Sequence, residues 1–308
     1  RFGELLADPA RLVLLQTLFV AVVVAIAAQG LQPGLQRAAR WAVPLIFALL
    51  GVGVAWQAAL ADGYLAALQV RLRPDYSQLG PEAVFHAASQ AFFTLSLATG
   101  AVFTAGRCRP VGTRLRGAAW TIVGLDTLAA VLATLLILPS LPLPDGFVSE
   151  GPALLFVSLP SWLGQQPGGA AVCGLLYVAL NLAALSSATV MLEPSVTWIG
   201  RRTGLGRRAS AVAGGMLVWV VALAGALSFS SWRAIRVAGA SLFDGLSFFG
   251  ANLLLPLGGL GVALLAGWTD LLDEHLPPGH GRRVTMTLLR YVVPGVLLAI
   301  LGVGLASW

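Results

Sequence analysis

Long apolar runs alternate with short polar segments along the chain, and each run has the length of a bilayer-crossing helix. Such a helix needs about 20 mainly apolar residues. Strands of a membrane barrel would be half as long and would alternate apolar with polar residues, which these runs do not do. The sequence therefore predicts an all-α integral membrane protein. Its eight expected spans are about 12–31, 41–61, 84–106, 117–138, 170–199, 209–229, 238–267 and 285–306.

Composition excludes the soluble classes of protein. Of the 308 residues, 57% are hydrophobic and only 10% are charged, with a mean hydropathy of +0.85. Soluble domains are about 45–50% apolar and about 25% charged. The same numbers exclude a disordered chain, a coiled coil and a secreted disulfide scaffold. The two cysteines, Cys108 and Cys173, lie far apart and form no metal or redox spacing.

The distribution of arginine orients the spans. The net charge is +6 and all basic residues are Arg, which in a soluble chain would suggest nucleic acid as a partner. Here twelve Arg fall in the alternate segments 32–40, 106–116, 200–208 and 268–284, and only four fall in the remaining segments between spans. Arg-rich loops stay in the cytoplasm. We therefore predict a multi-pass protein of the cell membrane with both termini outside. Its expected partner is the lipid bilayer, and no nucleic acid is expected to bind.

The first residues, Arg1–Glu4, include no Met and no cleavable signal. We expect the chain to be part of a longer protein.

Three acids lie within the expected spans. An ionisable group at membrane depth is costly and suggests function. Asp126 lies about ten residues into its run, and its alternative role is a packing hydrogen bond. Glu193 precedes Pro194 near the cytoplasmic end of its run, which favours a snorkelling or a structural role. Asp244 lies near an outer helix end, where a gating role and simple hydration are both open.

Small polar residues crowd the middle of the third run, in the stretch Gln90–Gly100. Thr94, Ser96, Thr99 and Gly100 either join packed helices through hydrogen bonds or mark a broken helix that exposes backbone to a substrate. The pattern alone leaves both open.

Ala183, Ser186 and Ser187 have the spacing i, i+3, i+4 and therefore share one helix face. One carbonyl and two hydroxyls on a face can supply oxygen ligands to a hard monovalent cation, and packing is the alternative. The stretch 204–209 imitates a dinucleotide fingerprint but has no preceding strand. Because no enzyme motif remains, we predict that the protein is not an enzyme.

With these residues the sequence resembles the neurotransmitter:sodium symporter family, in its bacterial amino-acid-transporter branch. The pieces that carry the resemblance, in the family's order, are 34–37, 44–47, 90–100, 126–130, 155–160 with 167–169, 186–194 and 252–259. The resemblance implies a LeuT-type fold of two inverted five-helix repeats.

The eight spans would match the family's fourth to eleventh helices. Residues 1–64 would hold the last two helices of the first repeat, and 84–267 the complete second repeat with a long outer loop at 139–169. Residues 285–306 would form an additional helix. The missing N-terminal helices of the same protein are then expected partners.

The resemblance also implies two Na⁺ sites. Thr94 and Asp126 would contribute to the first, with Asp126 standing where many members have Asn. Ala183 (through its carbonyl), Ser186 and Ser187 would contribute to the second.

The implied substrate-pocket positions are Phe93, Ser96, Thr99 and Met191, with Phe93 as a lid. The family's outer-gate acid falls at Ser247, so we expect Asp244, one turn earlier, to take that role.

The expected function is Na⁺-coupled symport of a small amino acid or related amine by alternating access, with a proton as the alternative coupling ion. Asp126 and Ala130 predict that chloride is not required, because Ala130 lacks the hydroxyl that chloride-dependent members use. The alternative is a non-transporting membrane scaffold or an inactive truncated fragment of such a transporter.

Overall fold

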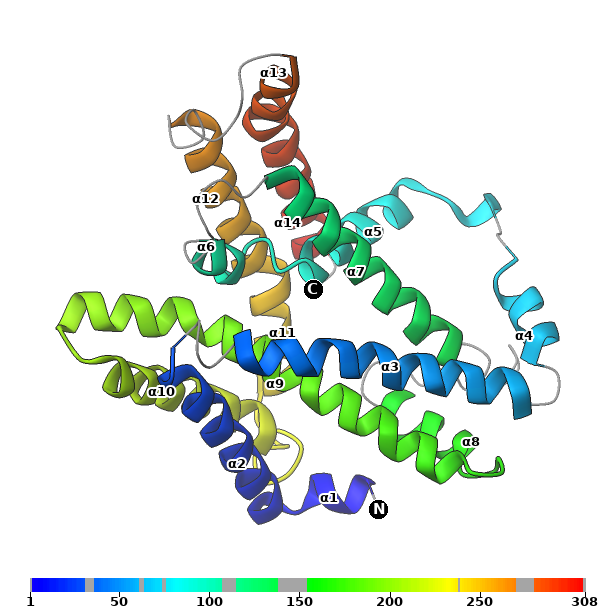
Figure 1. The fold of residues 1–308 in the computed structure, drawn as a ribbon. Coiled ribbons are helices and arrows are strands. Elements are labelled where there is room, and N and C mark those ends of the chain that lie inside the picture. Colours follow the sequence, from blue (N-terminus) through cyan, green and yellow to red (C-terminus); the bar gives the residue numbers. More distant parts are fainter. Residues whose placement is uncertain are drawn as a thin grey trace. The chain divides into compact units, whose positions relative to one another are not determined.

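The computed structural model describes residues 2–30, 36–60, 64–73, 76–106, 115–137, 154–237, 239–269 and 280–306, and most of these residues are helical (Figure 1). The chain divides into two compact units. Unit 1 comprises Arg1–Asp8, Leu14–Asp75 and Arg109–Gly215. Unit 2 comprises Pro9–Val13, Tyr76–Cys108 and Met216–Trp308.

The helical elements in chain order are α1 (Phe2–Ala7), α2 (Pro9–Ala28), α3 (Gln36–Leu60), α4 (Tyr64–Arg71), the 3-10 turn η2 (Tyr76–Gln78), α5 (Pro81–Thr94), α6 (Ala101–Gly106), α7 (Leu115–Ile137), the π-helical η4 (Leu154–Ser158), α8 (Leu159–Leu163), α9 (Gly169–Thr203), α10 (Arg207–Leu227), α11 (Leu242–Phe248), the π-helical η5 (Phe249–Leu254), α12 (Leu255–Trp268), α13 (His280–Thr287), the π-helical η7 (Leu288–Val292) and α14 (Val293–Ala306). A two-residue antiparallel hairpin pairs β1 (Arg236–Val237) with β2 (Ala240–Ser241).

Within the described ranges, seven helical stretches are long and apolar enough to cross a membrane. They correspond to seven of the eight expected spans and confirm the all-α membrane class. The eighth span, expected at 84–106, is not one helix. It is divided into α5 and α6, because the backbone leaves the helical conformation between Thr94 and Ala101.

Unit 1 has an apolar core where α3, α7, α8 and α9 meet. Its buried members are Leu50, Leu136, Leu159, Leu163, Val172 and Leu176. Gly53 of α3 allows close packing here, since a Cβ at this position would lie 3.1 Å from Leu136. The short segments are tied to the same core, because the Tyr177 hydroxyl donates to the Leu155 carbonyl at 2.9 Å. Tyr64 of α4 likewise donates to the Leu135 carbonyl at 3.2 Å, and burial raises the pKa of its phenol.

A second core of unit 1 joins α2, α9 and α10. Its buried members are Val23, Ala27, Leu192, Val196 and Ala211. The long helix α9 therefore contributes to both cores, through Val172 and Leu176 near its start and through Leu192 and Val196 further along.

In unit 2, α12 packs against α14, and close approaches occur at glycines. A Cβ at Gly304 would lie 3.1 Å from that of Asn252 in η5, and one at Gly267 would lie 3.2 Å from the Leu289 backbone. The Arg290 Nε donates to the Gly267 carbonyl at 2.6 Å, which satisfies an acceptor in the last turn of α12.

Gly169→Ala is predicted to destabilise the protein. A Cβ at Gly169 would overlap the backbone carbonyl of Leu163, which can move only with α8. Overpacking of this kind costs about 1–3 kcal/mol. The matched control is Gly174→Ala in the same helix, where a Cβ would meet nothing within 4 Å. Thermal unfolding of the detergent-purified protein measures both, and equal melting temperatures would contradict the prediction.

Candidate functional site

The break between α5 and α6 is the feature around which the site is built. α5 begins at Pro81, which suits the first turn of a helix, and ends at Thr94. Ser96 then has φ = 52° and Gly100 has φ = 72°. A left-handed conformation costs a non-glycine residue about 1 kcal/mol and cannot continue a right-handed helix. Of the two interpretations of this polar stretch, the broken helix is the one that the structure has.

Side chains of the break bond to its own backbone. The Thr99 hydroxyl donates to the Ser96 carbonyl at 3.1 Å and accepts from the Ala101 N–H at 3.3 Å. The structure thus brings together two of the predicted substrate-pocket residues, Ser96 and Thr99. α12 lies close by, since a Cβ at Gly258 would be 3.0 Å from the Ala98 carbonyl.

Phe93 and Thr94 occupy the last turn of α5, immediately before the break. The Phe93 side chain is 52% exposed. The Thr94 hydroxyl donates to the Ala91 carbonyl at 3.3 Å. The end of a helix carries partial negative charge from its last carbonyls, which favours a cation there.

On α9, two of the residues predicted for the second Na⁺ site are in contact. The Ser186 hydroxyl donates to the Ala183 carbonyl at 2.9 Å, and Ser187 is exposed on the next position. Two oxygens at this separation can both contact one hard cation if the hydroxyl turns its lone pairs outward. Met191, a predicted substrate-pocket residue, is exposed one turn further along.

Asp126 lies half-buried in α7, within unit 1. Its predicted partner Thr94 belongs to unit 2, so their joint Na⁺ site stays a prediction.

Asp244 lies in the first turn of α11, where it has a local role. Its carboxylate accepts from the Ser241 hydroxyl at 2.6 Å, and its N–H donates to the same hydroxyl at 3.1 Å. Ser241 is therefore the N-cap of α11, and the Asp244 carboxylate binds the capping hydroxyl. Ser247, one turn later, lines an apolar hollow of about 640 Å³ between α10 and α11, and the other described residues of the lining are apolar. The gating role of Asp244 stays a prediction.

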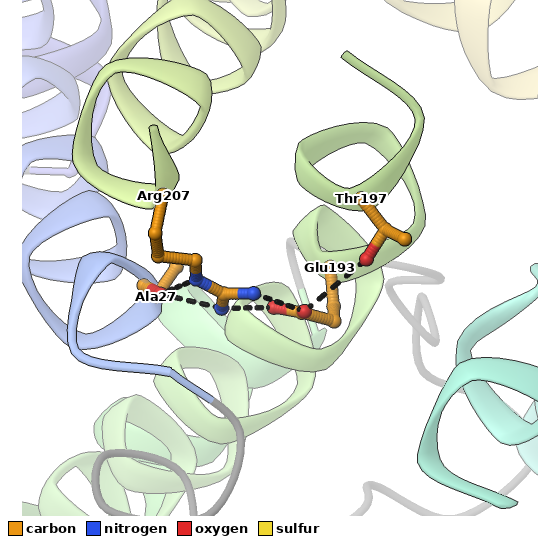
Figure 2. Close-up of polar contacts among 4 residues, drawn as sticks. All are labelled: Ala27, Glu193, Thr197 and Arg207. Atoms are coloured by element: carbon orange, nitrogen blue, oxygen red, sulfur yellow. Dashed lines mark hydrogen bonds and ion pairs between the residues drawn. The ribbon is translucent and has the colours of Figure 1, made fainter. Parts of the chain in front are cut away.

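Glu193 is structural, as its sequence position favoured. Its side chain is 3% exposed, and the Arg207 guanidinium donates to both carboxylate oxygens at 2.5 Å (Figure 2). The same guanidinium donates to the Ala27 carbonyl near the end of α2, at 2.6 and 3.0 Å. Thr197 adds a hydroxyl at 3.4 Å from Glu193. The network joins α2, α9 and α10 through one arginine.

Sequence reasoning missed Gln57, whose side chain is fully buried in α3. Neither of its amide atoms has a hydrogen-bond partner within the described part of the chain. Its only signal in the sequence is a single amide within an apolar run, without the neighbouring polar residues that marked the other candidates.

Three curated proteins are similar over most of the chain, and all three are named uncharacterized sodium-dependent transporters. The YhdH protein of Bacillus subtilis is 29% identical over 97% of this chain and 68% of its own length. A protein of Haemophilus influenzae is 26% identical over 95% of this chain and 65% of its own length. MJ1319 of Methanocaldococcus jannaschii is 31% identical over 86% of this chain and 54% of its own length. No protein-family model matches the sequence.

A solved structure agrees with these relatives. The crystal structure of MhsT in complex with L-phenylalanine superposes with a TM-score of 0.86 at 31% identity, covering 97% of this chain and 69% of that one. The chain belongs to the neurotransmitter:sodium symporter family. This neurotransmitter:sodium symporter has the LeuT-type fold, is a multi-pass protein of the cell membrane, and is a member of a family of sodium-coupled transporters rather than of enzymes.

Glu193→Ala is predicted to lower stability more than Arg208→Ala. Breaking a buried ion pair costs about 3–5 kcal/mol. We expect the lower end of this range or less, because the Arg207 side chain is 34% exposed. Arg208 is exposed, so its loss should change stability by about 0.5 kcal/mol at most.

Melting temperatures of the purified variants test this order. A double variant, Glu193→Leu with Arg207→Leu, should melt above Glu193→Ala because it leaves no unpaired charge. If Glu193→Ala has the same melting temperature as the wild type, the pair of Glu193 and Arg207 does not stabilise the contact between α2, α9 and α10.

Proposed function

We propose that this symporter moves a small amino acid or related amine together with Na⁺ by alternating access. The observation that carries the proposal is the left-handed break at Ser96 and Gly100 within a run that would otherwise span the membrane. Backbone without helical partners is tolerated at membrane depth only where protein or water covers it. Midplane breaks of this kind form the substrate and ion sites of transporters. The amino acid bound to MhsT supports the substrate class.

The substrate would contact the break through its charged groups. The C-terminal end of α5 favours the substrate ammonium, because the last carbonyls of a helix carry partial negative charge. Ser96 and Thr99 lie on the break, and Phe93 and Met191 supply apolar surface for the side chain. Phe93, about half exposed, would act as the lid.

Two Na⁺ sites would couple transport to the ion gradient. Ala183, Ser186 and Ser187 would hold one ion through oxygens on a single face of α9. Thr94 and Asp126 would hold the other, with the carboxylate supplying a full negative charge. Asp244 would contribute to the outer gate when it leaves Ser241. Movement of the two inverted repeats, of which the second comprises 84–267, would open the binding site alternately to the outside and to the cytoplasm.

Ser186→Ala, Ser187→Ala and Thr94→Ala are predicted to raise the Na⁺ concentration needed for half-maximal uptake. Each removes one oxygen from a cation, and a contact to a charge is worth about 1.5–3 kcal/mol, which corresponds to tenfold or more. The measurement is labelled amino acid uptake into proteoliposomes by the longest form of the protein that its gene encodes.

Ser195→Ala is the matched control, because Ser195 lies on the same helix two turns beyond Ser187. It should leave the Na⁺ dependence unchanged. Unchanged Na⁺ dependence in all three site variants would show that the hydroxyls at Thr94, Ser186 and Ser187 serve helix packing and do not bind Na⁺. If a proton gradient drives uptake without Na⁺, the coupling ion is the proton. A complete lack of uptake would favour the alternative of a non-transporting membrane scaffold.

Asp126 is the basis for proposing chloride independence. An ionised Asp126 repels an anion by about 4 kcal/mol for unit charges about 4 Å apart at an effective dielectric constant of 20. Ala130, one turn later on α7, offers no hydroxyl to hold one. The carboxylate instead balances the charge of the bound Na⁺.

Replacing chloride by gluconate is predicted to leave wild-type uptake unchanged. In Asp126→Asn the fixed charge is lost, so uptake should fall, and the Na⁺ concentration for half-maximal uptake should rise. Uptake into proteoliposomes measures both, with Glu4→Gln as a control that removes one exposed negative charge and keeps Asp126. Strong chloride dependence of the wild type would show that Asp126 does not balance the charge.

A further inference from the structure

The turn between α9 and α10 is a well-ordered helix hairpin. Gly204 ends α9 in the left-handed conformation, with φ = 72°. The Thr203 hydroxyl donates to the Ile199 carbonyl at 2.7 Å and accepts from the Leu205 N–H at 3.3 Å. Ser210 donates from its N–H to the Gly206 carbonyl at 3.0 Å. The backbone of this turn is therefore held in place by hydrogen bonds, and it carries the side chains described next.

Four arginines lie on this hairpin, but only one of them points inward. Arg207 is bound to Glu193 and to the end of α2. Arg201, Arg202 and Arg208 are exposed. None of these three has an ion pair within the part of the chain that the structure describes, and the sequence contains no Asp or Glu from 194 to 243. The hairpin thus presents three positive charges without a nearby acid on either of its helices.

An aromatic residue marks the depth of these charges in the membrane. Trp198 is 66% exposed and lies three and four residues before Arg201 and Arg202, so the three side chains share one face of α9. Exposed tryptophan at the end of a spanning helix lies at the headgroup level. The arginine distribution puts this end of α9 on the cytoplasmic side.

We propose that Arg201, Arg202 and Arg208, with Trp198, form a binding site for an anionic phospholipid of the cytoplasmic leaflet. The guanidinium groups bind the headgroup phosphate, and the indole lies beside the glycerol and upper acyl region. Planar guanidinium groups match phosphate oxygens well. Because α9 and α10 are joined to α2 through Arg207, a lipid held on this hairpin stabilises the junction of all three helices.

The test compares phosphatidylglycerol with phosphatidylcholine, each titrated onto the purified chain in neutral detergent and detected by native mass spectrometry. Wild type should bind phosphatidylglycerol more tightly. The triple variant Arg201→Gln, Arg202→Gln, Arg208→Gln should lose about 100-fold in affinity, about fivefold for each arginine near an anionic surface. High salt should reduce the wild-type preference, since exposed charges are screened.

Two controls separate a site from general positive charge. Arg233→Gln with Arg236→Gln removes two exposed arginines beyond the other end of α10 and should leave the affinity unchanged. The triple lysine variant keeps the charge and should keep most of the affinity. If the triple glutamine variant fails to fold, each single variant should still show its fivefold loss. Equal binding of the two lipids by wild type, or an unchanged triple variant, would overturn the proposal.

Discussion

A bilayer offers the polypeptide backbone no hydrogen-bond partner, and this constraint organises the whole chain. The seven spanning stretches satisfy it internally, with α9 alone extending over 35 residues. The segment between Thr94 and Ala101 does not. Its Thr99 hydroxyl replaces part of the missing ladder, and the backbone of α12 comes close at Gly258. Such a break persists only because it is covered or wetted, which is also what a binding site requires.

The same medium explains the network around Glu193. A carboxylate that is 3% exposed needs a counter-charge and further hydrogen bonds, and Arg207 and Thr197 supply them. Arg207 also donates to the Ala27 carbonyl in the last turn of α2, which accepts from the Gly30 N–H as well. One guanidinium therefore compensates a buried charge and adds a hydrogen bond at a helix end.

The length of the apolar runs predicted the spans well. A helix satisfies its own backbone hydrogen bonds, so the hydropathy of a run is enough to indicate whether it can cross the membrane. The break was ambiguous, since hydroxyls that join helices and hydroxyls at a break have the same spacing. What decides is the φ of Ser96, which depends on tertiary packing. Ala183 and Ser186 met as expected because helix geometry fixes an i, i+3 pair. The pairing of Glu193 with Arg207 required the hairpin turn, and that of Thr94 with Asp126 requires the placement of two separate units.

The placement of Ala183, Ser186 and Ser187 within α9 suits a site that must keep its geometry. Upstream of them, Val172 and Leu176 are buried against α3, α7 and α8, and downstream, Leu192 and Val196 are buried against α2 and α10. A helix held on both sides of its middle cannot shift those oxygens independently of either core. The break at 95–100 has the opposite character, because its backbone bonds are few and local. The proposed coupling of an ion to a larger solute would use both features: firmly held oxygens on α9 for the ion, and a break with few backbone bonds for the solute.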